Sequence, residues 1–143
     1  MTWHTYQSKF EWDGSLRDIY VLNTDIRDWQ ILIDMIRESR LEVLFVSGDV
    51  IEDLPEDISF IFKLPHDISY DLNVHLGRTI LRTHFFVENE IEIDLDPREV
   101  RDQADFDRLI SFMRNMAEYL NKDVVLAPEN CIEDPILIIQ SVA

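Results

Sequence analysis

The chain of 143 residues is poor in glycine, with three, and in cysteine, with one. Three isolated glycines cannot form the glycine-rich loop that cradles phosphate groups, and the G-x-S-x-G motif of serine hydrolases is missing. A single cysteine, Cys131, excludes an internal disulfide and a cysteine-based zinc site within one chain. These absences remove the common signatures of nucleotide-binding and hydrolytic enzymes.

Basic residues and long hydrophobic runs are also scarce. Thirteen Lys and Arg stand against 29 Asp and Glu, which gives a formal net charge of −16. This charge repels phosphate, so no binding to nucleic acid or to a membrane surface is expected. The longest apolar runs have four residues, for example at 43–46 and 136–139, whereas roughly 20 are needed to cross a bilayer. Residues 1–10 do not read as a secretory signal, and a cytoplasmic location is expected.

The composition is otherwise that of a folded globular protein. Hydrophobic residues make up 46% of the chain and aromatic residues 10%, so the acidity does not indicate disorder. At this length a single domain, residues 1–143, is expected. The excess of acids either only confers solubility or favours basic proteins, basic peptides and metal cations as partners.

Two segments, around 25–39 and 103–121, have the periodicity of amphipathic helices. Thr24 or Asp25 is the expected N-cap of the first, and Asp102 that of the second. Most of the remaining apolar segments predict strands. Four of these, from 59 to 96, follow one another with short connections, which favours an antiparallel meander. The expected fold is a two-layer α+β sandwich, in which two amphipathic helices cover one face of a mostly antiparallel sheet. The predicted strands are 5–12, 16–23, 41–47, 59–64, 68–76, 78–87, 91–96, 123–127 and 136–142.

A weak internal repeat links the two helical segments. Asp28-Trp29 matches Asp105-Phe106 at an offset of 77 residues, and Val43 matches Val124 at an offset of 81. Two origins are open: duplication of a helix–strand unit, or the chance likeness of two amphipathic helices that each precede a strand.

The most acidic segment runs from Glu88 to Asp107, with nine acids and two bases. Its first part alternates acids with Asn and apolar residues, which on a strand produces one carboxylate face and one apolar face. If 78–87 and 91–96 form a hairpin, a three-residue loop, 88–90, keeps the apolar side chains on one face. That register places His84 opposite Asp94 and Arg82 opposite Asp96, Val87 opposite Ile91, Phe85 opposite Ile93, and Thr83 opposite Leu95.

We therefore expect a non-catalytic module that presents an acidic face to a basic protein or peptide. Small acidic inhibitor and immunity-type proteins behave in this way, although the likeness is one of charge and size only. Near the N-terminus, Trp12 is either a core residue or an exposed aromatic anchor of an interface. The candidate partner-binding residues are Glu88, Glu90, Glu92, Asp49, Glu52, Asp53 and Trp12.

Two alternatives belong to other classes. The first is a small enzyme that uses His75, His84 and Asp94 as a metal site or as an acid–base cluster. The second is a structural protein that forms a homodimer through a sheet edge, with acidity serving solubility alone. No motif calls for a cofactor, and no metal site is predicted beyond that weak histidine cluster.

Overall fold

The computed structural model describes residues 1–63 and 67–141. Within these residues, no helix combines the length and the apolar character that a bilayer crossing requires. The helical elements are α1 (Trp3–Tyr6), η1 (Gln7–Phe10), α2 (Ile26–Ser39), η2 (Ser59–Phe62), η3 (Pro97–Glu99) and α3 (Gln103–Leu120). The strands are β1 (Arg17–Leu22), β2 (Glu42–Ser47), β3 (Val50–Glu52), β4 (Tyr70–Leu76), β5 (Thr79–Thr83), β6 (Glu90–Leu95), β7 (Val124–Pro128) and β8 (Leu137–Ile139).

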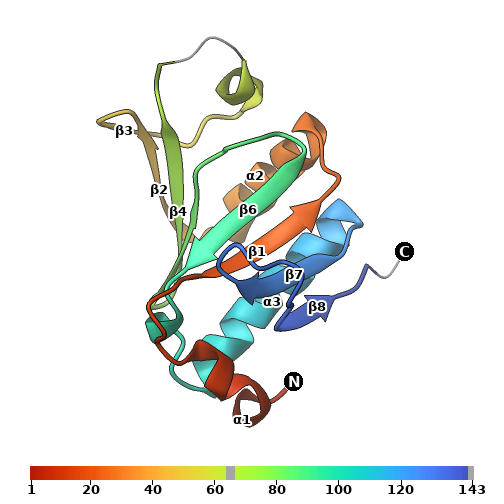
Figure 1. The fold of residues 1–143 in the computed structure, drawn as a ribbon. Helices are drawn as coiled ribbons and strands as arrows, with labels where there is room; N and C mark the ends of the chain where they lie inside the picture. The colour runs from red at the N-terminus through yellow and green to blue at the C-terminus, as the bar shows by residue number, and fades with distance from the viewer. Residues whose placement is uncertain (64–66, 142–143) are drawn as a thin grey trace.

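The strands form one antiparallel sheet in the order β3-β2-β4-β5-β6-β1-β7-β8. The helices α2 and α3 pack against each other and cover one face of this sheet, while no helix of the described residues covers the other face (Figure 1). The predicted two-layer α+β sandwich is thus confirmed. The meander is also present as β4-β5-β6, and β1 is inserted between β6 and β7.

The two long helices begin where their sequences predict. Asp25 accepts hydrogen bonds from the N–H groups of Arg27 and Asp28, and Asp28 accepts one from the Asp25 N–H, which completes a capping box. Asp102 caps α3 by accepting from the Asp105 N–H. Each helix ends at a residue in the left-handed conformation, Arg40 for α2 and Asn121 for α3, so both stop cleanly before a strand.

Apolar side chains from both helices and from every second position of the strands form one continuous core. On β6, Ile91, Ile93 and Leu95 are buried, while the acids between them are only half-buried. The alternation read from the sequence is therefore the alternation between the helix-covered face and the open face of the sheet. Because the apolar side chains of β6 are buried under the helices, the carboxylates that alternate with them lie on the open face.

Two predicted strands are wrong. Residues 5–10 lie in α1 and η1 instead, where Trp3, Tyr6 and Phe10 pack around Phe106 of α3 at ring distances of 5.4–6.0 Å, and residues 11 and 12 belong to no helix or strand. Most of 59–64 is the 3-10 helix η2, which buries Ile61 (Leu64 lies outside the described residues). In both segments, packing of aromatic rings and of one aliphatic side chain outweighs the strand preference of the residue types. Of 136–142, only Leu137–Ile139 pairs as β8, and Val142 also lies outside the described residues.

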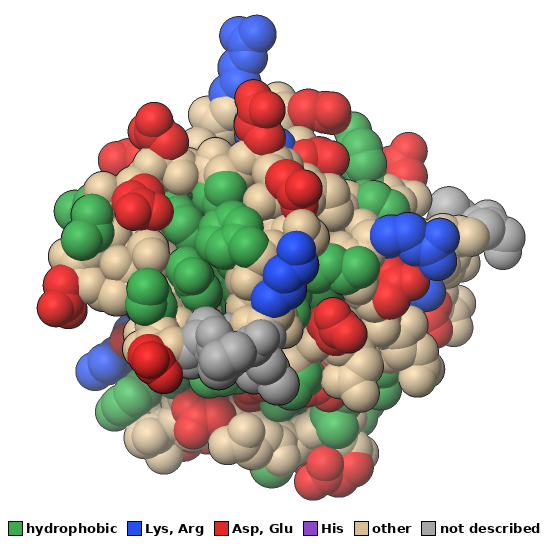
Figure 2. Space-filling model, turned by 90° about the horizontal axis from the view of Figure 1, so that it is seen from above, with side chains coloured by type: hydrophobic (Ala, Val, Ile, Leu, Met, Phe, Trp, Pro, Cys, Tyr) green, Lys and Arg blue, Asp and Glu red, His purple; other side chains and the backbone are tan. Residues whose placement is uncertain are grey.

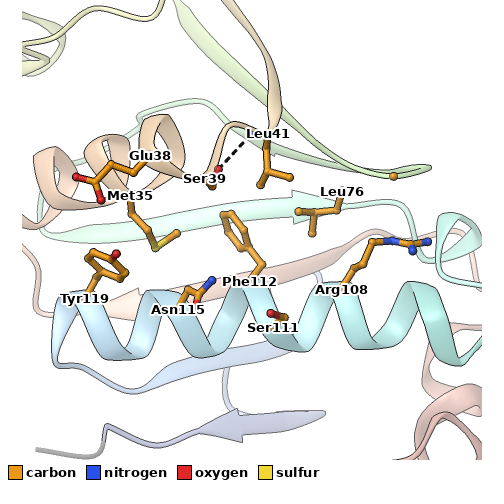
Figure 3. Close-up of a pocket in the computed structure, with 11 residues that line it drawn as sticks. Met35, Glu38, Ser39, Leu41, Leu76, Arg108, Ser111, Phe112, Asn115 and Tyr119 are labelled. Carbon is orange, nitrogen blue, oxygen red and sulfur yellow. Dashed lines mark hydrogen bonds between the residues drawn. The ribbon is translucent and has the colours of Figure 1, made fainter.

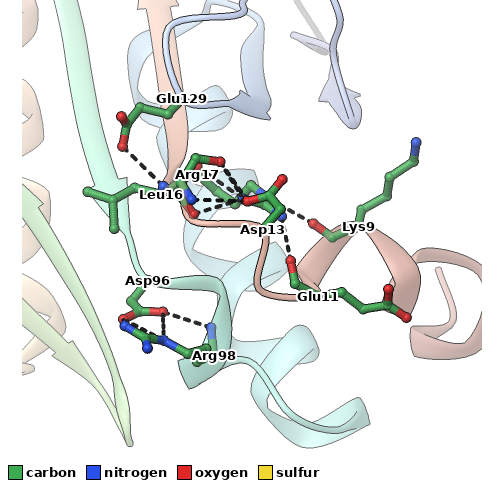
Figure 4. Close-up of polar contacts among 9 residues, drawn as sticks. Lys9, Glu11, Asp13, Leu16, Arg17, Asp96, Arg98 and Glu129 are labelled. Carbon is green, nitrogen blue, oxygen red and sulfur yellow. Dashed lines mark hydrogen bonds and ion pairs between the residues drawn. The ribbon is translucent and has the colours of Figure 1, made fainter.

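A buried arginine ties the N-terminal segment to the sheet. Arg17 at the start of β1 is only 3% exposed and donates to the backbone carbonyls of Lys9, Glu11 and Ser15, and to the Asp13 carboxylate, at 2.8–3.2 Å (Figure 4). A buried guanidinium is costly unless its donors are satisfied. This residue therefore organises the chain from η1 to β1 rather than serving as a free positive charge.

A second charged cluster holds the start of α3 to the β4–β5 turn. Asp105 is fully buried and accepts from Arg78 Nε at 2.7 Å, from the Arg101 N–H at 3.0 Å and from Arg108. Burial alone would raise the pKa of Asp105, but these donors outweigh it and lower the pKa below its ordinary value. The turn itself contains Gly77 at a positive φ, with Arg108 packed against it.

The two halves of the sheet have equivalent outer parts. Each long helix leads into the second strand from an edge and then into the edge strand itself: α2 into β2 and β3, α3 into β7 and β8. A half-turn about an axis perpendicular to the sheet exchanges these positions. The duplication suggested by the sequence remains a prediction, but the arrangement of the elements agrees with it.

Candidate functional site

The connection between β5 and β6 departs from the predicted hairpin. Arg82 pairs with Asp94, and Val87 pairs with Glu90 around a two-residue turn, Glu88-Asn89. The predicted loop 88–90 and all five predicted cross-strand pairs are therefore wrong, because the register of β5 against β6 is shifted by two residues. The shift of two residues at Arg82 keeps the side chains of β5 on their predicted faces, whereas Val87 is shifted by one residue and lies opposite Glu90 instead of on the apolar face.

Phe85 interrupts the regular pairing between Arg82 and Val87. It has a φ of 54°, a conformation that bulky residues rarely adopt, and it is 6% exposed. Its ring packs against Trp29 at 5.1 Å, Phe62 at 6.2 Å and Phe45 at 6.3 Å, so core packing stabilises the unusual backbone. The chain leaves the regular ladder here, and the next residue, Phe86, faces solvent with 68% of its surface exposed.

His84 stands next to this pair, between two carboxylates on the open face. Its Nδ1 contacts Asp71 of β4, and its Nε2 lies 3.2 Å from Asp94 of β6. Burial lowers the pKa of His84, but the two carboxylates outweigh it and the pKa is raised above 6.5. The Phe86 ring lies 5.2 Å from the imidazole. The imidazole of His84 thus packs beside the exposed Phe86 ring, and both nitrogens of the imidazole contact a carboxylate.

The carboxylates of β6 face further acids from β1. Asp94 lies opposite Asp18, and Glu92 lies opposite Tyr20. Burial and the nearby charges of Asp18, Glu90 and Asp94 raise the pKa of Glu92, while His84 offsets them only partly. The pKa of Asp94 is raised too, first by burial and then by Asp18, against the lowering effect of His84 and Arg82. The open face therefore concentrates negative charge that its own bases do not balance.

Asp18 shows how this crowding is tolerated. It is 1% exposed and accepts hydrogen bonds from the Tyr20 hydroxyl at 2.7 Å and from the Asn130 N–H at 3.0 Å. Burial, followed by the Asp18 carboxylate, raises the pKa of Tyr20, so its hydroxyl stays protonated and able to donate.

The turn of the hairpin holds the acids that remain unpaired. Thr24 fixes it from the side, because its hydroxyl donates to the Glu88 carbonyl at 2.7 Å and its N–H donates to the Asn89 carbonyl at 3.1 Å. The side chains of Glu88, Glu90 and Glu92 make no ion pair within residues 1–63 and 67–141. We call Phe86, Val87, Glu88, Glu90 and Glu92 the β5–β6 tip.

The tip lies at the end of the sheet that is uppermost in Figure 1. Seen from that end, hydrophobic side chains gather in one area, with acidic and basic side chains around it (Figure 2). Six large apolar residues with at least 40% of their surface exposed belong to the segments that form this end: Leu22, Val50, Phe60, Ile68, Phe86 and Val87. Five others, Met1, Trp12, Ile51, Tyr119 and Ile138, are comparably exposed. An apolar centre with a charged rim is the usual composition of a protein-binding surface.

The other predicted partner-binding residues lie outside the β5–β6 tip. Asp49, Glu52 and Asp53 are exposed on the β2–β3 hairpin at one edge of the sheet, and Asp49 lies next to Val50 at the same end of the sheet as the tip. Trp12 is 48% exposed, but the guanidinium of Arg98 stacks over its ring at 3.7 Å, in the loop region before β1. Arg98 also pairs with Asp96, so the predicted pairing of Arg82 with Asp96 is replaced by a local contact. The structure therefore divides the predicted site into three separate places.

The predicted enzymatic cluster does not assemble. His75 pairs with Ile80 on the open face, and the Asn73–Arg82 pair lies between it and the row of His84. Only His84 and Asp94 are brought together. In the described part of the chain, no three His, Cys, Asp or Glu side chains are arranged to hold a metal ion.

A hollow that the sequence did not predict lies between the two helices. It has a volume of about 480 Å³, and Met35 of α2 and Phe112 of α3 approach each other across it, with Leu41 and Leu76 at one side (Figure 3). Arg108 stands at one end but is already bonded to Asp105. Glu38 also lines the groove and forms no ion pair among the described residues, while the rest of the lining near Met35 and Phe112 is mostly apolar.

Sequence reasoning also missed the role of Phe86. The run Phe85-Phe86-Val87 contained a signal, because three consecutive large apolar residues cannot all face the core of a half-buried strand. Asp71 lies on β4, and its contact with His84 depends on the register of β4 against β5. Comparison of the chain with known protein families, with curated proteins and with solved structures finds no match.

Proposed function

We propose that the protein binds a basic protein partner through the β5–β6 tip and performs no catalysis there. The observation that carries this proposal is the exposed Phe86 beside three acids, Glu88, Glu90 and Glu92, that have no ion pair among the described residues. Aromatic residues are enriched at interfaces and anchor them. Unpaired acids around such an anchor attract a basic surface and speed its association.

The electrostatics of β6 favour a cationic partner. The pKa of Glu92 is raised because burial and three neighbouring carboxylates disfavour its charge. A Lys or Arg of the partner, placed near Glu92, would reverse this cost. Binding would then offset the repulsion between Glu92 and the neighbouring carboxylates, which the free protein retains. A role in binding would therefore explain why these acids lie close together on the open face.

Catalysis is not favoured because the one histidine in the cluster is fully engaged. Both ring nitrogens of His84 contact carboxylates, so neither is directed at a substrate proton. Among acidic binding proteins, inhibitors and immunity-type proteins are the class that this proposal fits. A cytoplasmic location is part of the same proposal.

The test begins with affinity capture from a cell extract at low salt, using the wild type and matched variants as bait. Phe86→Ala removes the anchor, and a Glu88→Lys/Glu90→Lys variant reverses the rim. The control is Glu118→Lys/Glu133→Lys, which makes the same charge change at two exposed positions away from the tip. The proposal predicts a basic protein that the wild type and the control retain and that both tip variants lose.

Kinetics with that purified partner complete the test. We expect its association rate to fall at least about tenfold between low and high salt, because electrostatic steering contributes 10-fold or more at such surfaces. Phe86→Ala should weaken binding by roughly 30-fold, the effect of a typical hot spot. A partner that tolerates both tip variants, or one whose association ignores salt, would show that the tip is not the binding surface.

A further inference from the structure

The edge strand β3 covers only half of its neighbour. It pairs with Phe45, Val46 and Ser47, whereas β4 on the other side pairs with all six residues of β2. Among the described residues, no strand pairs with the first half of β2, Glu42–Leu44, on the β3 side. A cleft of about 520 Å³ lies there, between Val43 and Leu44 on one side and residues 51–54 on the other. We call this cleft the β2 slot.

The backbone of Val43 opens into the β2 slot. Just after β2, the Gly48 N–H donates to the Ser69 carbonyl at 2.9 Å, on the β4 side. Backbone groups alternate between the two sides of a strand, so those of 42, 44 and 46 also face β4. The N–H and C=O of Val43 therefore face the slot, where the described part of the chain supplies no hydrogen-bond partner.

The other half of the molecule shows what this position can hold. Val124 of β7 is the counterpart of Val43, because β2 and β7 both follow a long helix and lie second from an edge. The Glu129 N–H donates to the Leu16 carbonyl on the β1 side, so by alternation the backbone groups of Val124 face β8. There Val124 pairs with Ile139. Strand β8 therefore occupies, beside Val124, the position that is open beside Val43.

The charge around the slot defines the occupant. Glu42, Glu52 and Asp53 are exposed, and none of them forms an ion pair within the described ranges. An incoming segment with Lys or Arg would complement them. A second copy of this chain would bring the same three acids and be repelled.

We propose that the β2 slot accepts an extended basic segment of a partner protein as an added antiparallel strand. Its backbone pairs with the N–H and C=O of Val43, as Ile139 pairs with Val124, and its basic side chains lie near Glu42, Glu52 and Asp53. Strand addition of this kind takes affinity from backbone hydrogen bonds and selectivity from alternate side chains. The slot lies at a sheet edge away from the β5–β6 tip, so this proposal stands independently of the proposed function.

The test follows the Val43 amide by hydrogen exchange in NMR, with the Val124 amide of the same protein as internal reference. In the free protein the Val43 amide should exchange much faster than that of Val124. A short blocked peptide of alternating lysine and valine should slow exchange at Val43 by about tenfold or more, as a new backbone hydrogen bond requires. The matched peptide of alternating glutamate and valine should leave it unchanged.

Three results would overturn the proposal. Slow exchange at Val43 in the free monomer would show that the chain itself closes the slot. Slow exchange together with a dimer in sedimentation would show that a second copy fills it. Unchanged exchange at Val43 with saturating lysine–valine peptide would show that no strand is added.

Two further comparisons separate backbone pairing from simple charge attraction. Two peptides, each N-methylated at one of the two alternating sets of amides, are compared. The peptide methylated at the amides that face β2 should not bind, whereas the peptide methylated at the other set should bind. Equal binding of both would rule out strand pairing. Glu52→Lys/Asp53→Lys should weaken the peptide about tenfold, an effect equivalent to one charge-assisted contact, while Glu118→Lys/Glu133→Lys should not.

Discussion

Two carboxylates at opposite ends of the sheet show how this acidic chain uses its charges differently. Asp105 is fully buried at the start of α3, and three donors surround it and lower its pKa. Glu92 is half-buried on the open face, and burial together with neighbouring acids raises its pKa. The first charge stabilises the fold, because its donors replace the water that it lost. The second destabilises it.

The difference extends to the surroundings of each residue. Around Asp105, the side chains of Arg78 and Arg108 are neutralised within the molecule. Around Glu92, the one base among the described residues that forms an ion pair with the acids is His84, which is shared by Asp71 and Asp94. A region that retains unbalanced charge at a cost in stability is a candidate for function, while a balanced region is explained by folding alone.

The largest expected effect is at the balanced end. Asp105→Ala should lower the free energy of unfolding by about 3 kcal/mol, because it leaves a buried N–H and two guanidinium groups without their acceptor. Urea denaturation monitored by tryptophan fluorescence measures this. Asp102→Ala, which removes the exposed cap of the same helix, should cost only about 1 kcal/mol. Equal losses for the two variants would mean that the buried network adds nothing beyond helix capping.

Glu92→Gln should act in the opposite direction. Removing a charge that its neighbours repel should raise the free energy of unfolding by about 0.5 kcal/mol at neutral pH, a value kept small by solvent screening at a half-exposed site. The same denaturation experiment measures it, with Glu118→Gln as a control of equal charge change. A loss of stability at Glu92 would contradict the comparison between the two ends.

The two ends should also respond to acid in opposite ways. The pKa values of Glu92 and Asp94 are raised above 4.5 and 3.8, so the folded state binds more protons than the unfolded state. Their destabilising effect should therefore fade as the pH drops through these raised values. Asp105 has a lowered pKa, so its contribution is present above 3.8 and should be lost only as the pH falls through its folded value.

His84 adds a third step on the alkaline side. Its pKa is raised above 6.5, so its contribution is complete below 6.5 and should be lost as the pH rises through the folded value. Unfolding midpoints measured across pH, with NMR titration of the carboxyl and imidazole signals, resolve all three groups. Glu92→Gln should flatten the mildly acidic region alone, and a uniform change across the whole range would contradict the assignment.

Salt should give the smallest effect. Raising the ionic strength should stabilise the wild type by a few tenths of a kcal/mol, because screening weakens the repulsion among its excess acids. A Glu88→Gln/Glu90→Gln/Glu92→Gln variant should gain less from the same change, whereas Glu118→Gln should behave as the wild type does. Identical salt responses would place the uncompensated charge away from the tip.

The sequence predicted the elements whose patterns are long. The stripes of α2 and α3, their aspartate caps and the two faces of β6 were correct, because each repeats one signal over several residues. The proximity of His84 and Asp94 was also predicted, although from a register shifted by two residues. The shorter signals failed at 5–12 and 59–64, where aromatic residues with strand preference form helical turns instead.

The sequence by itself determined that the acids of β6 share one face and that two amphipathic helices cover the other, since helical and strand periods are local properties of the chain. Only the tertiary structure decided which acids are balanced. Phe85 entered the core in a left-handed conformation and interrupted the regular pairing of β5 with β6, while Arg78, Arg101 and Arg108 converged on Asp105. Such contacts join residues far apart in the chain, and their geometry depends on how the core packs.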